Sequence, residues 1–149
     1  MNPQNGYDIE DISVGMSAET AKTITDADIV LFAGVSTDVN AVHMDEEFGK
    51  TTMFGGRIAH GMLSASLLSA VLGNRMPGPG TIYLSQSLRF RAPVRPGDTV
   101  RAKATVREVV VDKCRVVVDT VCTVGAKVVI DGEATLMATS RKKREAAGK

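Results

Sequence analysis

The pattern of hydrophobic and polar positions changes partway along the chain. From about Arg57 to Gly73, apolar side chains cover more than one face of a helix and are interrupted only by small serines. After residue 80, apolar and polar residues alternate with a period of two, as they do in strands with one buried face. The pattern therefore predicts one helix buried nearly all round, followed by a series of strands.

Turn-forming residues separate the predicted elements. Gly-Asn at 73–74 and Pro-Gly-Pro-Gly at 77–80 end the helix. The predicted strands cover about residues 16–25, 81–90, 100–106, 115–124 and 127–139, and the last of them is expected to bend or bulge at Gly132. Because helices come early and strands late, we expect an α+β fold in which one long antiparallel sheet closes over the apolar helix, as a single domain over residues 1–149.

Shorter elements are predicted on either side of this framework. Residues 25–28 read Thr-Asp-Ala-Asp, which resembles a capping box and predicts a helix over residues 26–34. Residues 35–40 lose all periodicity and are expected to form a loop, and a second short helix is expected over residues 45–50. The basic segment from about residue 141 to the end is expected to be a frayed tail.

Composition narrows the classes of partner. The 149 residues carry a formal net charge of only +1, so no basic field indicates nucleic acid. No apolar run reaches the roughly 18 residues of a membrane span, and the polar start does not resemble a signal peptide. Cys114 and Cys122 are too far apart along one predicted strand to bridge each other, so we expect reduced thiols in a cytoplasmic protein.

The aperiodic segment carries a candidate acid-base pair. Asp38 and His43 lie five positions apart, and a loop can bring such side chains together. Addition of water to a conjugated double bond needs a base for the water and an acid for the adjacent carbon, and this pair can supply both. The alternative is that Asp38 and Asn40 only cap the following turn while His43 is a structural residue.

The start of the apolar helix is a second candidate. Free backbone N–H groups at a helix start favour negative charge, so the Gly61 amide could hold the oxygen of a thioester carbonyl as it becomes enolate-like. The alternative is that Gly61 only allows close packing. His60 is expected to be a packed, hydrogen-bonded residue outside the reaction, and Ser69 could bond either a ligand or a backbone carbonyl.

These features resemble one family in their order and spacing. The residues that carry the resemblance are 38–45 (DVNAVHMD), 58–62 (IAHGM), 82–90 (IYLSQSLRF) and 93–98 (PVRPGD). Over roughly residues 13–138, the chain looks like the MaoC-like (R)-specific enoyl-CoA hydratases. The resemblance implies a hot-dog fold, in which the sheet wraps the apolar helix, and a homodimer with a continuous sheet.

The resemblance also implies roles for individual residues. Asp38 and His43 match the pair that activates water and protonates the α-carbon, and Gly61 matches the glycine whose amide serves the thioester oxygen. Ser69 matches a helix serine near the acyl chain, and Asn40 matches an asparagine with a supporting role. Many members carry proline after that asparagine, whereas alanine stands here. This departure affects the stiffness of the loop and not the reacting groups.

The expected activity is the reversible hydration of trans-2-enoyl-CoA to (R)-3-hydroxyacyl-CoA. No cofactor is expected beyond coenzyme A as the carrier of the substrate, and the spacing of histidines and cysteines predicts no metal site. Arginines at 89, 91 and 95 and the basic run 141–144 could meet the phosphates of coenzyme A or be solvated. The alternatives are an acyl-carrier-protein dehydratase, a thioesterase, or a non-catalytic subunit that binds acyl chains.

Overall fold

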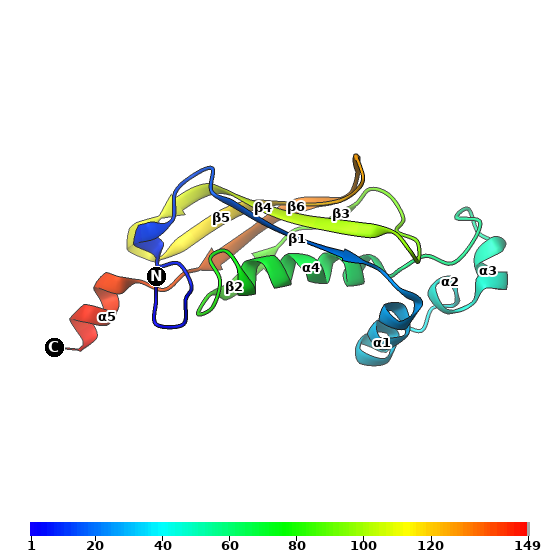
Figure 1. Cartoon of the computed structure of the whole chain (residues 1–149), viewed down its shortest axis with the longest axis horizontal. Coiled ribbons are helices and arrows are strands. Elements are labelled where there is room, and N and C mark those ends of the chain that lie inside the picture. Colours follow the sequence, from blue (N-terminus) through cyan, green and yellow to red (C-terminus); the bar gives the residue numbers. More distant parts are fainter. Residues whose placement is uncertain (149) are drawn as a thin grey trace.

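The computed structural model describes residues 1–148 and contains one antiparallel sheet (Figure 1). Its strands are β1 (Ser17–Thr23), β2 (Ile82–Gln86), β3 (Arg89–Phe90), β4 (Thr99–Val110), β5 (Arg115–Val124) and β6 (Lys127–Met137). They follow the order β1-β4-β5-β6-β2, and β3 also pairs with β6. The helices are α1 (Asp26–Ser36), α2 (Ala41–Met44), α3 (Glu46–Lys50), α4 (Gly61–Asn74) and α5 (Arg141–Ala147).

The core lies between α4 and the concave side of the sheet. Helix α4 buries Leu68, Val71 and Leu72, and β4 and β5 turn alternate residues toward it, as the period of two predicted. Helices α1, α2 and α3 lie near the N-terminal end of α4, whereas α5 and the N-terminus of the chain lie near its C-terminal end (Figure 1). The α+β architecture expected from the sequence is confirmed.

Helix α4 differs from the expected helix in its start and in its burial. It begins at Gly61 and not at Arg57, because the amides of Ile58 and Ala59 donate outside the helix, to the carbonyls of Val42 and Val94. The helix is also not buried all round. Within residues 1–148, nothing covers a stripe formed by Met62, Ser66, Ser69 and Gly73, which recur with the helical period.

A bend or bulge was expected at Gly132, and the bulge is not there. Gly132 pairs with Thr120 in an unbroken stretch of register, and the shift between β5 and β6 lies instead between Cys122 and Thr123. Gly132 is needed for a different reason. A Cβ at this position would lie 1.9 Å from the carbonyl oxygen of Ser87, in the short link between β2 and β3. The glycine therefore lets this link pass directly over β6.

The short helices follow the predicted signals closely. The capping box at the start of α1 is present, with Thr25 and Asp28 each accepting a hydrogen bond from the backbone amide of the other. Helix α1 continues to Ser36, two residues beyond the predicted end, and Asp45 caps α3. None of the helices described over residues 1–148 combines the length and apolar character needed to cross a membrane.

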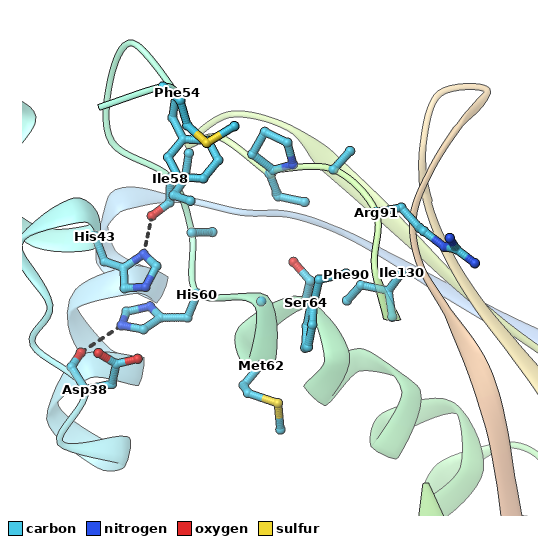
Figure 2. Close-up of a pocket in the computed structure, with 16 residues that line it drawn as sticks. Asp38, His43, Phe54, Ile58, His60, Met62, Ser64, Phe90, Arg91 and Ile130 are labelled. Atoms are coloured by element: carbon cyan, nitrogen blue, oxygen red, sulfur yellow. Dashed lines mark hydrogen bonds between the residues drawn. The ribbon is translucent and has the colours of Figure 1, made fainter. Parts of the chain in front are cut away.

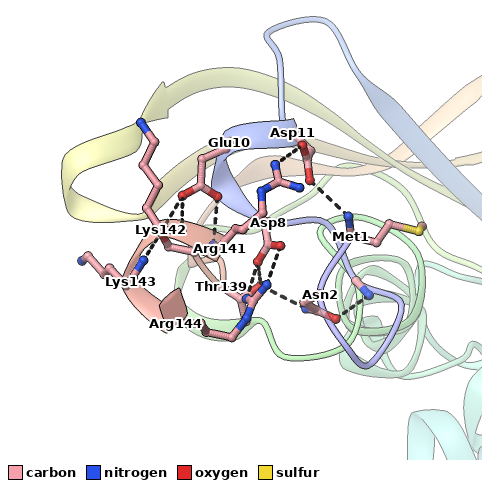
Figure 3. A network of polar contacts seen from close by, with 12 residues as sticks. Met1, Asn2, Asp8, Glu10, Asp11, Thr139, Arg141, Lys142, Lys143 and Arg144 are labelled. Atoms are coloured by element: carbon pink, nitrogen blue, oxygen red, sulfur yellow. Dashed lines mark hydrogen bonds and ion pairs between the residues drawn. The ribbon is translucent and has the colours of Figure 1, made fainter. Parts of the chain in front are cut away.

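The expected frayed tail is also wrong, because residues 141–147 form α5. A clasp of polar contacts holds this helix against the N-terminal segment (Figure 3). The Arg144 guanidinium donates two hydrogen bonds of 2.6 and 2.8 Å to the carboxylate of Asp8, whose residue is 0% exposed. Glu10 accepts from the Ser140 hydroxyl and from the first amides of α5, and so stabilises the positive end of the helix dipole.

The clasp predicts acid sensitivity. The hydrogen bond from Arg144 lowers the pKa of Asp8 to about 2, despite its burial. Burial raises the pKa of Glu10, but hydrogen bonds from Ser140 and from backbone amides outweigh it and lower that pKa to about 2. Because both values are depressed below the unfolded-state values of 3.8 and 4.5, the stabilisation is complete above about pH 5 and is lost progressively as the pH falls to about 2.

We therefore expect Asp8→Asn to lower the free energy of unfolding at neutral pH by up to about 2 kcal/mol and to flatten its dependence on pH between about 5 and 2. Urea titrations from pH 2 to 7 would measure both effects. Asp119→Asn is the control, because Asp119 pairs with Arg107 at an exposed position where such pairs contribute little. Equal losses in the two variants would contradict the assigned role of the clasp.

Candidate active site

A cavity of about 490 Å³ lies at the N-terminal end of α4 (Figure 2). Apolar side chains make up much of its wall, among them Phe54, Ile58, Phe90 and Ile130. Asp38, His43 and His60 line one side, and Gly61 and Ser64 of α4 contribute the helix start. The two candidate features of the sequence, the acid-base pair and the helix-start glycine, thus meet at one cavity.

Local hydrogen bonds place the acid-base pair. Thr37 is the C-cap of α1 and adopts the left-handed conformation, with φ of 64°. Asp38 is the first residue after this helix end. The Asp38 carboxylate accepts a hydrogen bond of 3.2 Å from the amide of Asn40, and the Asn40 side chain caps α2 by accepting from Val42. His43 therefore lies on a short helix and not in the loop expected from the sequence. The structure places Asn40 as the residue that begins this helix.

Backbone carbonyls determine which nitrogen of each histidine carries hydrogen. The Nδ1 atom of His43 lies 2.8 Å from the carbonyl oxygen of Ile58. Since a carbonyl can only accept, Nδ1 is the donor and the Nε2 of neutral His43 keeps its lone pair. In the same way, the Nε2 of His60 donates to the carbonyl oxygen of Asp38 over 2.8 Å, which leaves a lone pair on Nδ1.

His60 contacts both members of the pair. Its ring, 2% exposed, lies 4.0 Å from the ring of His43 between centroids and 4.9 Å from that of Phe32. The expected packed and hydrogen-bonded residue is confirmed, but its contacts position Asp38 and His43. The three side chains also offer ligand atoms that lie within 4.8 Å of one another, so this is the group that could hold a metal ion. That no metal is needed stays a prediction.

We expect replacement of His60 to lower kcat by roughly 10²-fold, because displacement of reacting groups by about 1 Å has an effect of that size. His60→Gln keeps a donor that can reach the carbonyl of Asp38, whereas His60→Phe keeps only the packed ring. If His60 holds Asp38 through its hydrogen bond, the Gln variant should retain more activity than the Phe variant. Steady-state kinetics with circular dichroism would test this order, and the reverse order would contradict it.

Gly61 lines the cavity with a backbone amide that has no hydrogen-bond partner within residues 1–148. Gly61 is the first residue of α4, its N-cap residue His60 makes no capping bond through its side chain, and no acceptor within residues 1–148 takes the Gly61 N–H. A Cβ here would lie 2.5 Å from the ring of Phe90. The packing role that the sequence left open for Gly61 is therefore present, and it coexists with an amide that can bind an anionic oxygen.

The structure separates Ser69 from this cavity. Ser69 lies more than two helical turns beyond Gly61, on the exposed stripe, and does not line the cavity. Ser64, which the sequence shows only as a small interruption of the apolar pattern, does line it. The sequence did contain a sign of this position, because Ser64 is a polar residue on the helix face that carries Leu68 and Leu72.

The basic residues considered for phosphate contacts fall into two groups, one near the cavity and one far from it. Arg91 lines the cavity and pairs with Asp131 at 3.0 Å, and Arg95 donates to the carbonyl of Phe54 nearby. Arg141 and Arg144 belong to the clasp at the far end of α4 (Figure 1). These two are therefore not placed to meet a ligand in this cavity.

The match to a protein family covers this site. Residues 11–130 match the MaoC like domain, and every residue that lines the cavity lies within that stretch. The chain belongs to the MaoC-like domain family. The clasp helix α5 lies outside the matched residues.

Relatives of this MaoC-like chain include named enzymes. It is 58% identical over 132 residues to an (R)-specific enoyl-CoA hydratase of Rhodospirillum rubrum, covering 89% of this chain and 92% of that protein. It is 47% identical over 137 residues to a 3-hydroxybutyryl-CoA dehydratase of Methylorubrum extorquens, covering 92% and 86%. The solved R-hydratase PhaJ1 of Pseudomonas aeruginosa, in its unliganded form, is 44% identical with a TM-score of 0.86, covering 91% of this chain and 88% of that one. The expected hot-dog fold is confirmed.

Proposed function

We propose that this chain catalyses the reversible hydration of trans-2-enoyl-CoA to (R)-3-hydroxyacyl-CoA. The observation that carries the proposal is the meeting of three features at one largely apolar cavity: the Asp38 carboxylate, the Nε2 lone pair of neutral His43, and the open Gly61 amide. The named activities of the relatives support it, and the stereochemistry rests on them alone.

The pair divides the work of orienting the water and of transferring its proton. The Asp38 carboxylate orients a water molecule, and His43 Nε2 takes one of its protons as the water oxygen bonds to the β-carbon. The electron pair of the double bond moves toward the thioester, whose oxygen gains negative charge. The imidazolium then returns a proton to the α-carbon, so that H and OH have been added across the double bond. Dehydration is the same sequence in reverse.

The helix start stabilises the charge that develops. The Gly61 N–H belongs to a residue that lines the cavity and has no acceptor within residues 1–148, and the dipole of the 14-residue helix α4 adds to its positive potential. The reaction as written uses only these groups and the thioester, so we propose coenzyme A as the carrier and no further cofactor. The two buried free thiols, Cys114 and Cys122, support a cytoplasmic location.

The assay that tests the proposal follows crotonyl-CoA in two ways. A hydratase removes the absorbance of the enoyl thioester and releases no free thiol, whereas a thioesterase releases the thiol. Chiral analysis of the product tests the (R) configuration, and the same acyl group on acyl carrier protein tests the carrier. Binding of crotonyl-CoA with neither reaction would indicate a non-catalytic subunit and would overturn the proposal.

We further propose that the chain forms a homodimer through β2 and the exposed stripe of α4. Strand β2 is the last strand of the sheet, and its Ile82 and Leu84 are 55% and 42% exposed. A second β2 at this edge would continue the sheet and bury these apolar side chains. The stripe, which includes Ser69, would then be covered.

A charge placed at this edge is expected to weaken the dimer. Leu84→Arg should raise the dimer dissociation constant by at least about tenfold, because an unpaired charge in an interface costs more than 1.4 kcal/mol. Sedimentation equilibrium would measure the change. Val111→Arg, at an exposed position in the 3-10 turn Val111–Lys113, is the control. A monomeric native chain would reject the proposed assembly.

A further inference from the structure

Two buried side-chain polar atoms within residues 1–148 have no hydrogen-bond partner, and both belong to residues that line the cavity. They are the Nδ1 of His60 and the Oγ of Ser64. Ser64 is 0% exposed. An unpaired hydroxyl at such a position costs free energy, and native proteins keep very few of them. A hydroxyl that is unpaired in the protein and borders a substrate cavity indicates a polar group on the ligand.

The position of Ser64 on α4 brings its hydroxyl close to the open helix start. Ser64 follows Gly61 by three residues, and residues at this spacing lie on neighbouring parts of one helix face. Helical side chains lean toward the N-terminus, so the Ser64 side chain extends over the turn that carries the Gly61 amide. Figure 2 shows Ser64 in the first turn of α4, beside Phe90.

The chemistry of the substrate decides what this hydroxyl meets. Near its double bond, an enoyl thioester has one strong hydrogen-bond acceptor, the carbonyl oxygen, while the acyl chain beyond it is hydrocarbon. We propose that the Ser64 hydroxyl donates a hydrogen bond to this oxygen and is a second donor next to the Gly61 N–H. This inference rests on the proposed hydratase function and adds a catalytic residue to it.

Such a donor acts mainly in the transition state. The carbonyl oxygen carries little charge in the bound substrate and becomes enolate-like as water attacks, so the hydrogen bond strengthens during the reaction. Loss of the hydroxyl should therefore lower kcat more than it raises KM. A single donor of this kind typically contributes about 10²-fold or more to kcat.

The test replaces Ser64 and a matched buried hydroxyl. Ser64→Ala should lower kcat for crotonyl-CoA by roughly 10²-fold and leave the melting temperature unchanged or higher, because no bond within the protein is lost. Thr120→Val is the control, since the buried Thr120 hydroxyl accepts a hydrogen bond of 2.9 Å from Gln86 away from the cavity. This variant should show the opposite result, a lower melting temperature with unchanged kcat.

A binding experiment separates this inference from the proposed function. Butyryl-CoA cannot be hydrated but keeps the carbonyl oxygen, whereas its thioether analogue S-butyl-CoA lacks that oxygen. The native protein should bind butyryl-CoA more tightly than the thioether, and Ser64→Ala should reduce this preference. Calorimetric titration measures both, even if the native protein hydrates nothing and the proposed function fails.

Three results would overturn the role of Ser64. One is a Ser64→Ala variant with kcat within about twofold of native, and another is an unchanged preference for butyryl-CoA. The third is a marked fall in the melting temperature, which would show that the hydroxyl is bonded within the protein. If the Ala variant does not fold, Ser64→Cys, a weaker donor of similar size, undergoes the same two measurements.

Discussion

Asp38→Asn and His43→Ala are each expected to lower kcat for crotonyl-CoA hydration by about 10² to 10⁴. Asn replaces the charged carboxylate that orients the water with a neutral amide, and Ala removes the Nε2 lone pair that the bond from Nδ1 to Ile58 leaves free. Both variants should keep the fold, because Asp38 is exposed and His43 is only partly buried. Progress curves at saturating substrate, with circular dichroism of each variant, would measure these effects.

Asp112→Asn is the matched control for the acid-base pair. Asp112 is also an exposed aspartate, but it lies in the turn between β4 and β5 and outside the cavity. Its replacement should leave kcat within about twofold of native, as surface substitutions usually do. Folded Asp38 and His43 variants that hydrate crotonyl-CoA at the native rate would reject the assigned chemistry. In that case the cavity would have to serve another reaction.

Gly132→Ala is expected to have the largest effect on folding. The new Cβ would lie 1.9 Å from the backbone oxygen of Ser87, so either β6 or the link between β2 and β3 must move. Overpacking in a fixed environment usually costs 1 to 3 kcal/mol, and a clash with backbone belongs at the upper end, about 3 kcal/mol. Urea denaturation of the variant and the native protein would give this difference.

Gly34→Ala shows what the same change does without a clash. Gly34 lies in α1 with no atom near the position of an added Cβ, so alanine should stabilise the helix by about 0.5 to 1 kcal/mol. Opposite signs for the two glycines are therefore expected. If Gly132→Ala were as stable as the native protein, the close approach of Ser87 to β6 would have to be revised.

Both predictions concern the same end of the molecule. The link between β2 and β3, which passes close to Gly132, continues into Phe90 of β3. The ring of Phe90 packs on Gly61 and lines the cavity. A change at Gly132 that leaves the chain folded should therefore also disturb the helix start. The site thus depends on β6 as well as on the residues that carry the chemistry.

Some features could be derived from the sequence because neighbouring residues determine them. The capping box at Thr25 and the alternation along β4 and β5 each depend on contacts within one element or on one buried face. The apolar run after Gly61 belongs to the same class, because a helix can bury so many apolar side chains only in a core. The acid-base pair was visible as well, since its members lie only five positions apart along the chain.

Features that join distant segments were decided by the tertiary structure. Asp8 meets Arg144 across 136 positions, and a pattern read along the chain showed only a polar start and a basic end. His60 bonds the backbone of Asp38, 22 positions away, so its place beside the pair has no local signal. The same holds for Ser64, which reads as a small residue in an apolar helix until Phe90 and Ile130 form a cavity beside it.

The sequence by itself thus determined most of the strands, the helices α1, α3 and α4, the burial of α4 against the sheet, and the residue types able to transfer protons. The tertiary structure decided where α4 begins, which of its serines face the cavity, and that the C-terminal residues form a helix. The physical reason is that periodicity reports only whether a residue faces the core. Which partner it meets there depends on how strands and helices distant in sequence pack together, and these contacts place Gly61, His60 and Ser64 around one cavity.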